Sequence, residues 1–124
     1  MNSKSKKLHG LYAITDSTLD QEHPLMEQIA LAITGGARVI QYRDKQKSPM
    51  DRIREAATLL LICQRSSIPL IINDDVDLAL SIGADGVHLG KDDPDLTEAR
   101  KLLGPDTIIG VSCYNQFELA VEAE

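Results

Sequence analysis

The stretch LIINDDVDLALSIGADGVHLGKDD, residues 70–93, decides the fold of this chain. It contains two short apolar segments, residues 70–72 and 86–89, and each of them is too short to form a helix. We predict that both are buried strands of a parallel sheet. Between them, Asp75 is placed to cap a short helix that ends at Gly83. Strand, helix and strand within so few residues indicate a repeating βα unit.

Carboxylate and amide side chains follow both of these strands. Asn73, Asp74 and Asp75 follow the first, and Asp92 and Asp93 follow the second. Neighbouring parallel strands lie about 4.8 Å apart, so these groups should meet at one edge of the sheet. Two close carboxylates repel, and a divalent cation such as Mg²⁺, with phosphate oxygens completing its shell, would relieve the repulsion. The alternative is that Asp75 only caps the helix and that Asp92 and Asp93 belong to a solvated turn.

The same alternation of strand and helix runs through the whole chain. We predict parallel strands near residues 11–15, 38–42, 69–73, 86–89 and 107–111, with helices between them. Strict alternation with short loops predicts an α/β fold with right-handed crossovers. We expect a (β/α)₈ TIM-barrel type, here with about five βα units, and a doubly wound open sheet is the alternative. The sequence has no GxGxxG or GxxxxGK[ST] motif for nucleotide binding.

Each predicted helix carries apolar residues at helical spacing, and the second begins with Ser48 as cap and Pro49 in its first turn. These apolar residues should face the sheet. In the second, third and fourth helices they are Ile53, Ala56, Ala57, Leu60, Leu61, Val76, Ala79, Leu80, Leu96, Ala99, Leu102 and Leu103.

Composition narrows the possible partners. The chain has 124 residues, a net charge of −6, one Phe and no Trp, which argues against a nucleic-acid or membrane-surface binder. Cys63 and Cys113 have no CxxC partner, which favours a reduced, cytoplasmic protein. No apolar run approaches the roughly 20 residues of a membrane span. Residues 1–10 are predicted to be a flexible basic tail, and residues 11–124 a single domain.

Polar residues follow all five predicted strands, at the end where a (β/α)₈ barrel places its active site. Two cations, a metal-binding pair and neutral donors on one rim suit a diphosphate, above all one that leaves during a reaction. Arg43 and Lys45 could instead form a solvated turn with Asp44 as their ion-pair partner, and His88 is interpreted as a packed or hydrogen-bonded core residue. The rim residues are Asp16, Arg43, Lys45, Asn73, Asp74, Lys91, Asp93 and Ser112.

Five segments closely resemble the thiamine phosphate synthase family, in the order and at the spacing of that family. They are LYAITD (11–16), QYRDK (41–45), INDDVDLAL (72–80), GADGVHLGKDD (83–93) and IIGVSCYN (108–115). The resemblance implies a TIM-barrel transferase of thiamine biosynthesis. Such an enzyme joins 4-amino-2-methyl-5-hydroxymethylpyrimidine diphosphate to a thiazole phosphate and releases diphosphate. It implies a dissociative reaction in which the thiazole nitrogen attacks a pyrimidine carbocation.

The resemblance also implies roles for individual residues. The QYRDK segment would bind the pyrimidine substrate, with Gln41 on the aminopyrimidine and Tyr42 and Asp44 as further members. The diphosphate would be gripped by Arg43, Lys45 and Asn73; Mg²⁺ would be bound by Asp74 and Asp93. The catalytic residues would be Ser112, which also hydrogen-bonds the pyrimidine substrate, together with Arg43 and Lys45. The alternative within the family is the thiazole tautomerase branch, which tends to lack the metal-binding aspartates and has a histidine just after the fifth strand. This chain has the aspartates, and has Cys113 and Tyr114 at that place, which favours the synthase.

The chain is much shorter than the members of that family. Strands six to eight and the thiazole phosphate site are therefore expected to be absent, which makes residues 11–124 a partial barrel. Open sheet edges predict a homo-oligomer or a completing partner chain. Two other interpretations stay open: a non-catalytic module that binds pyrimidine diphosphate and Mg²⁺, and a purely structural remnant.

Overall fold

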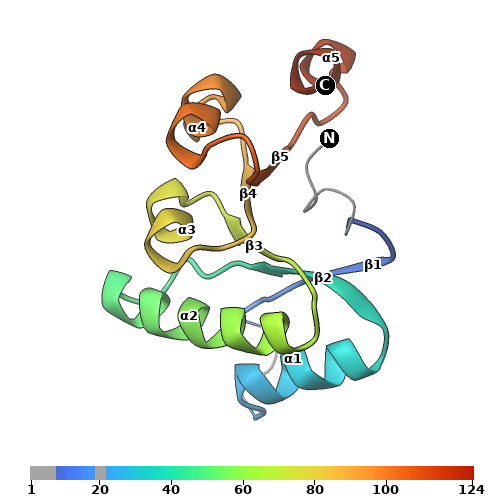
Figure 1. Cartoon of the computed structure of the whole chain (residues 1–124), viewed down its shortest axis with the longest axis vertical. Coiled ribbons are helices and arrows are strands. Elements are labelled where there is room, and N and C mark those ends of the chain that lie inside the picture. The colour runs from blue at the N-terminus through green and yellow to red at the C-terminus, as the bar shows by residue number, and fades with distance from the viewer. Residues whose placement is uncertain (1–7, 19–21) are drawn as a thin grey trace.

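The computed structural model describes residues 8–18 and 22–124, which form a five-stranded parallel sheet flanked by helices (Figure 1). The strands are β1 (Leu11–Ile14), β2 (Ala37–Tyr42), β3 (Leu70–Asn73), β4 (Gly86–Leu89) and β5 (Ile108–Val111). The helices are α1 (Leu25–Thr34), α2 (Pro49–Arg65), α3 (Val76–Ile82), α4 (Leu96–Leu103) and α5 (Phe117–Ala123). The five predicted strands are confirmed to within one residue. Most of the predicted tail, residues 1–7, lies outside the described residues, so that prediction stays untested.

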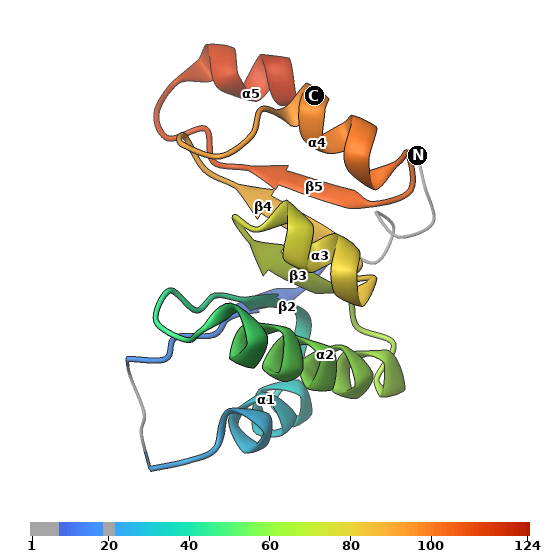
Figure 2. The ribbon, with the colours of Figure 1, turned by 90° about the vertical axis from the view of Figure 1, so that its left-hand side faces the viewer.

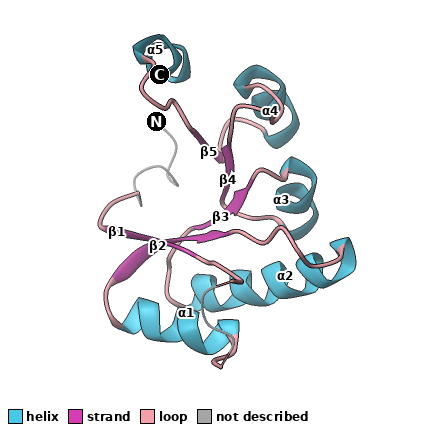
Figure 3. Ribbon diagram, turned by 180° about the vertical axis from the view of Figure 1, so that it is seen from behind, coloured by secondary structure: helices cyan, strands magenta, loops and turns pink. Residues whose placement is uncertain are grey.

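The strands lie in sequence order, β1-β2-β3-β4-β5, and every neighbouring pair is parallel. A doubly wound sheet reverses its strand order at a switch point, and this sheet has no reversal. Helices α1 to α4 lie along one face of the curved sheet (Figures 2 and 3). The order and the one-sided helices confirm the barrel-type prediction over the doubly wound alternative.

The two faces of the sheet differ in packing. Outward-facing residues such as Ile40, Leu70 and Val87 belong to the main core, which the sheet forms with the helices. Residues of the opposite face, Val39 and Ile71 among them, form a second and much smaller cluster with Ile108. The bulk of the apolar stabilisation therefore lies between sheet and helices, on the side away from a barrel's interior.

Side-chain caps start three of the helices and fix where the loops leave the strands. The Ser48 hydroxyl accepts a hydrogen bond from the Asp51 N–H at 3.2 Å, with Pro49 in the first turn. Asp75 accepts from the Leu78 N–H and Asp95 from the Glu98 N–H, both at 2.9 Å. Gly83 ends α3 with φ of 71°, a conformation that glycine adopts freely. The capping predictions for Ser48, Asp75 and Gly83 are confirmed.

Four residues predicted to face the sheet are exposed instead: Ile53, Leu61, Leu80 and Leu102. The buried positions of α2 and α3 include Leu59, Cys63 and Leu78, which the sequence analysis did not select. Successive residues of a helix lie about 100° apart, so a residue next to the buried stripe points sideways. The error came from assigning too wide an apolar face to short helices that contact the sheet along one narrow line.

No helix within residues 8–18 and 22–124 is both long enough and apolar enough to cross a membrane.

Candidate functional site

The carboxyl ends of β2, β3 and β4 bring Lys45, Asp74 and Asp93 together. Asp74 is the first residue after β3 and has φ of 66°, in the left-handed region, which aspartate and asparagine tolerate better than most residues. Its backbone N–H donates to the His88 carbonyl at 2.8 Å, which ties the turn to β4. Lys45, from the loop after β2, forms an ion pair with the Asp74 carboxylate. The predicted meeting of these charged groups at one edge of the sheet is confirmed.

The Asp74 and Asp93 carboxyl groups interact directly, and each shifts the pKa of the other. Burial raises the pKa of Asp93, and the neighbouring Asp74 raises it further. The hydrogen bond from the Gly90 N–H acts in the opposite direction and is outweighed. Burial also acts to raise the pKa of Asp74, but the hydrogen bonds from Lys45 and Asp93 outweigh it and lower that pKa. Close carboxylates repel, and this repulsion is one cause of the raised pKa of Asp93.

The carboxylates of Asp74 and Asp93 both lie close to Gly90. A Cβ atom on Gly90 would lie 3.3 Å from Asp93 Oδ2 and 4.0 Å from Asp74 Oδ1. The described residues contain no cluster of three or more His, Cys, Asp or Glu side chains suited to a metal ion. Mg²⁺ commonly takes one or two carboxylates and fills its remaining positions with water and phosphate oxygens. The donor set fits that kind of cation site and does not form a closed protein cage.

A hollow of about 480 Å³ borders Asp74 on the helix side, and its lining includes Lys45, Asn73, Asp74 and Arg52. Arg52 of α2 reaches the rim and donates to Asp75 Oδ2 at 3.1 Å. Asp75 therefore caps α3 and joins it to α2, as the capping alternative predicted. Arg52 could not be predicted as a rim residue, because an arginine within a helix gives no sign of reaching a loop 23 residues away.

Arg43 lies exposed at the end of β2, and it lines a second hollow of about 410 Å³ together with Lys45 and Asp16. The buried Thr15 fixes its backbone: Thr15 Oγ1 accepts from the Arg43 N–H at 2.8 Å and donates to the Arg43 carbonyl at 3.2 Å. Hydrogen bonds from Thr18 lower the pKa of Asp16, with a smaller contribution from the Arg43 charge. Thr15, a threonine at the end of an edge strand, was not singled out from the sequence.

Ser112 follows β5 and contacts His88 of β4, a contact that was not predicted from the sequence. His88 Nε2 lies 2.9 Å from Ser112 Oγ. The imidazole passes over Gly110, where an added Cβ would stand only 2.7 Å from His88 Nδ1. A glycine at position 110 is therefore required for this contact. The interpretation of His88 as a hydrogen-bonded residue is confirmed, and its bond orients the hydroxyl at the rim.

Gln41 lies on the inner face of the sheet, where its side chain is buried. Its Nε2 donates to the Tyr12 hydroxyl at 3.0 Å, so the amide has a fixed orientation below the rim. Burial raises the pKa of Tyr12 despite this hydrogen bond, and Tyr12 therefore stays a neutral partner.

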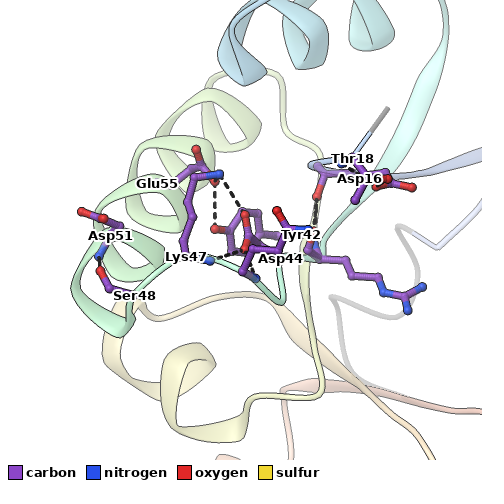
Figure 4. Close-up of polar contacts among 11 residues, drawn as sticks. Asp16, Thr18, Tyr42, Asp44, Lys47, Ser48, Asp51 and Glu55 are labelled. Carbon is purple, nitrogen blue, oxygen red and sulfur yellow. Dashed lines mark hydrogen bonds and ion pairs between the residues drawn. The ribbon is translucent and has the colours of Figure 1, made fainter. Parts of the chain in front are cut away.

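The structure does not bring the Tyr42 and Asp44 side chains to the rim. Asp44 is buried, and its Oδ1 accepts from the Gln46 and Lys47 backbone N–H groups at 2.8 and 2.9 Å. Lys47 Nζ lies 2.9 Å from Asp44 Oδ2 and 3.3 Å from Glu55 Oε1, and the Tyr42 hydroxyl donates to Glu55 at 2.9 Å (Figure 4). These side chains bind the loop after β2 to α2. The predicted contact of Tyr42 and Asp44 with substrate stays a prediction, which the backbone of these residues could still satisfy.

Comparisons with known proteins agree on one family. The family model described as thiamine monophosphate synthase matches residues 11–124. The chain is 52% identical over 120 residues to a thiamine-phosphate synthase of Nitrosococcus oceani, and the match covers 97% of this chain and 55% of the relative. It is 48% identical to a thiamine-phosphate synthase of Nitrosospira multiformis, covering 96% and 50%.

Among solved structures, a thiamine phosphate pyrophosphorylase from Pyrococcus furiosus superposes with a TM-score of 0.83 at 36% identity. The superposition covers 94% of this chain and 55% of that protein. The chain thus spans about half the length of the relatives it matches.

Proposed function

Because the chain belongs to the thiamine monophosphate synthase family, we propose that it supplies the pyrimidine diphosphate site of a thiamine phosphate synthase. The full reaction joins 4-amino-2-methyl-5-hydroxymethylpyrimidine diphosphate to a thiazole phosphate and releases diphosphate. The carbon–oxygen bond to the diphosphate breaks, and its electron pair leaves with the diphosphate. The thiazole nitrogen then forms the new bond to the methylene carbon.

One observation carries this proposal: two interacting carboxylates, Asp74 and Asp93, stand beside Lys45 at the carboxyl edge of the sheet. A divalent cation bound between the two carboxylates would relieve their repulsion. Mg²⁺ held there would neutralise the charge that develops on the leaving diphosphate. The oxygen donors of the pair and the neighbouring cations suit that chemistry.

The remaining rim residues bind and orient the substrate. Arg43 and Lys45 attract the diphosphate oxygens, and Asn73 donates a neutral hydrogen bond to them. Lys45 pairs with Asp74 in this structure, so a bound diphosphate would compete for its ammonium group. Gln41, held by Tyr12, faces the inner side where the aminopyrimidine would lie. Ser112, oriented by His88, would hydrogen-bond the same substrate.

A second candidate is a module that binds the pyrimidine diphosphate with Mg²⁺ and does not perform the condensation. It is favoured by the roles that the family resemblance implies, since each rim residue with a role is assigned to the diphosphate substrate or its Mg²⁺ and none to the thiazole phosphate. The two candidates share the site and differ only in whether product forms.

Calorimetric titration with inorganic diphosphate, with and without Mg²⁺, tests the shared site. Binding should require Mg²⁺ and should weaken at least about tenfold in Asp74→Asn and Asp93→Asn. Asparagine is the right replacement at position 74 because it tolerates the left-handed backbone. Asp92→Asn is the matched control, because Asp92 is exposed and adjacent to Asp93. The proposal would be contradicted if diphosphate bound equally well without Mg²⁺. It would also be contradicted if Asp92→Asn weakened binding as much as Asp74→Asn and Asp93→Asn do.

An assay for thiamine phosphate with both substrates and Mg²⁺ separates the two candidates. Product formation supports the synthase, and intact Mg²⁺-dependent binding without product supports the module. A further control is Asp77→Asn, an exposed carboxylate in the first turn of α3 that should leave binding unchanged.

A further inference from the structure

The turn after β3 that carries Asp74 has a strained backbone. Asp74 has φ of 66°, and the Asp75 N–H donates to the Asn73 carbonyl, two residues back, at 2.8 Å. This is a γ-turn with a positive central φ, which is the rare and strained form. A strained turn persists only where the surrounding contacts hold it. The contacts of this turn therefore decide where the Asp74 carboxylate points.

Two elements besides α3 hold the turn. From β4, the His88 carbonyl accepts a hydrogen bond from the Asp74 N–H at 2.8 Å. From α2, Arg52 Nη1 donates to Asp75 Oδ2 at 3.1 Å. The other oxygen of that carboxylate, Asp75 Oδ1, accepts from the Leu78 N–H at 2.9 Å. Asp75 therefore uses one oxygen to cap its own helix and the other to bind α2.

Arg52 differs from a solvated helix arginine in its surroundings. Its side chain is 23% exposed, whereas that of Arg54 on the same helix is 74% exposed. Within the described part of the chain, Arg52 Nε is buried and has no hydrogen-bond partner. A buried donor without a partner is unfavourable, so the other contacts of the guanidinium group must keep it in this place. Its ion pair with Asp75 is such a contact.

Arg52 and Lys45 join the same two loops. Lys45, in the loop after β2, pairs with Asp74, and Arg52, near the start of α2, pairs with the adjacent Asp75. A bound diphosphate would compete for Lys45, whose side chain is 59% exposed, and would weaken its pair with Asp74. The Arg52–Asp75 pair is less exposed, so it can keep the two loops together when Lys45 turns to the ligand.

We propose that Arg52 is a positioning residue for the cation site: its ion pair with Asp75 holds the strained turn so that the Asp74 carboxylate faces the cation. This role rests on the proposed function and adds to it a residue from a helix. Arg52 acts through Asp75 and does not itself touch Mg²⁺ or diphosphate.

Mg²⁺ titrations of diphosphate binding, followed by calorimetry, test this role. Arg52→Gln should raise the Mg²⁺ concentration for half-maximal binding about tenfold, the usual effect of losing a group that orients a metal ligand. At saturating Mg²⁺ the diphosphate affinity should change less than about twofold, because the rim cations remain. Arg54→Gln is the matched control, since it removes the same charge from an exposed position of the same helix. It should change neither quantity.

A double variant separates action through Asp75 from direct contact with the ligand. Asp75→Asn keeps a cap for the Leu78 N–H but removes the charge that pairs with Arg52. Combined with Arg52→Gln, it should weaken Mg²⁺ binding no further than the weaker single variant, because both changes break one interaction. Arg52→Lys keeps a cation beside Asp75 and should bind Mg²⁺ more tightly than Arg52→Gln. Effects that multiply in the double variant, or no rescue by Arg52→Lys, would overturn the proposal.

Amide hydrogen exchange of the metal-free chain gives a measurement that needs no ligand. The Asp74 and Asp75 N–H groups should exchange faster in Arg52→Gln than in Arg54→Gln, and the N–H of Ile72 in the core should exchange equally in both. Equal exchange at Asp74 and Asp75 would overturn the proposal, as would an unchanged Mg²⁺ requirement in Arg52→Gln. Absence of Mg²⁺-dependent binding in the unmodified chain would instead overturn the proposed function.

Discussion

Two acidic clusters lie at the same edge of the sheet, and they differ in how their charge is balanced. Asp44, in the loop after β2, is buried and bonded to two backbone N–H groups and to Lys47. Asp74 and Asp93, in the loops after β3 and β4, interact with each other and share Lys45. The first cluster is satisfied within its own loop, and the second has more negative charge than its neighbours balance. Only the second has a physical reason to bind a cation.

The largest expected effect is on stability, from Asp44→Asn. The replacement leaves Lys47 without its closest carboxylate and weakens the hydrogen bonds to the loop backbone. Asp44 is buried but Lys47 is exposed, so weakening this pair together with the backbone hydrogen bonds should cost roughly 2 kcal/mol of unfolding free energy. Urea unfolding of the variant and of Asp92→Asn, an exposed control, measures the difference. A loss as small as that of the control would mean that Asp44 does not anchor the loop.

The contribution of Asp44 to the unfolding free energy should also decrease in acid. Burial acts to raise the pKa of Asp44, but the hydrogen bonds from Lys47 and Gln46 outweigh it and lower that pKa. A carboxyl group with a lowered pKa stabilises the fold above its unfolded-state pKa of about 3.9. This contribution is lost as the pH falls through the folded-state pKa. Unfolding free energy measured between pH 6 and pH 3 should fall less steeply in Asp44→Asn than in the unmodified chain; parallel curves would contradict this assignment.

Tyr42→Phe should have a smaller effect of about 1 kcal/mol, the net value of one hydrogen bond. The phenol ring stays in the core, and only the bond from its hydroxyl to Glu55 is lost. Burial and the adjacent Glu55 raise the pKa of Tyr42, so the group is neutral throughout the physiological range. Urea unfolding of Tyr42→Phe gives the measurement, and Tyr12→Phe on the other face of the sheet, where Tyr12 is 41% exposed, is the comparison. No change in Tyr42→Phe would show that Lys47 alone holds Glu55.

The contrast between these clusters marks what the sequence could and could not predict. Alternating patterns and caps located every strand, because local chain geometry determines them. The pairing of Asp74 with Asp93 followed from placing two parallel strands side by side. The sequence could not place Asp44, because a carboxylate between Arg43 and Lys45 looks equally suited to the rim. Its inward turn depends on Lys47, Glu55 and the packing of α2, which are tertiary contacts.

The smallest expected effect is an increase in stability, whereas Asp44→Asn and Tyr42→Phe should decrease it. Asp93→Asn should raise the unfolding free energy at pH 7 by about 0.5 kcal/mol in metal-free buffer, because one carboxylate of a repelling pair is removed. The amide oxygen can still accept from the Gly90 N–H, and the amide nitrogen can donate to the Asp74 carboxylate. A carboxyl group with a raised pKa destabilises the fold once it ionises, so the gain should vanish below about pH 4. Urea unfolding at both pH values with EDTA present measures this. A loss comparable to that of Asp44→Asn would show instead that the second cluster, like the first, holds its loops together.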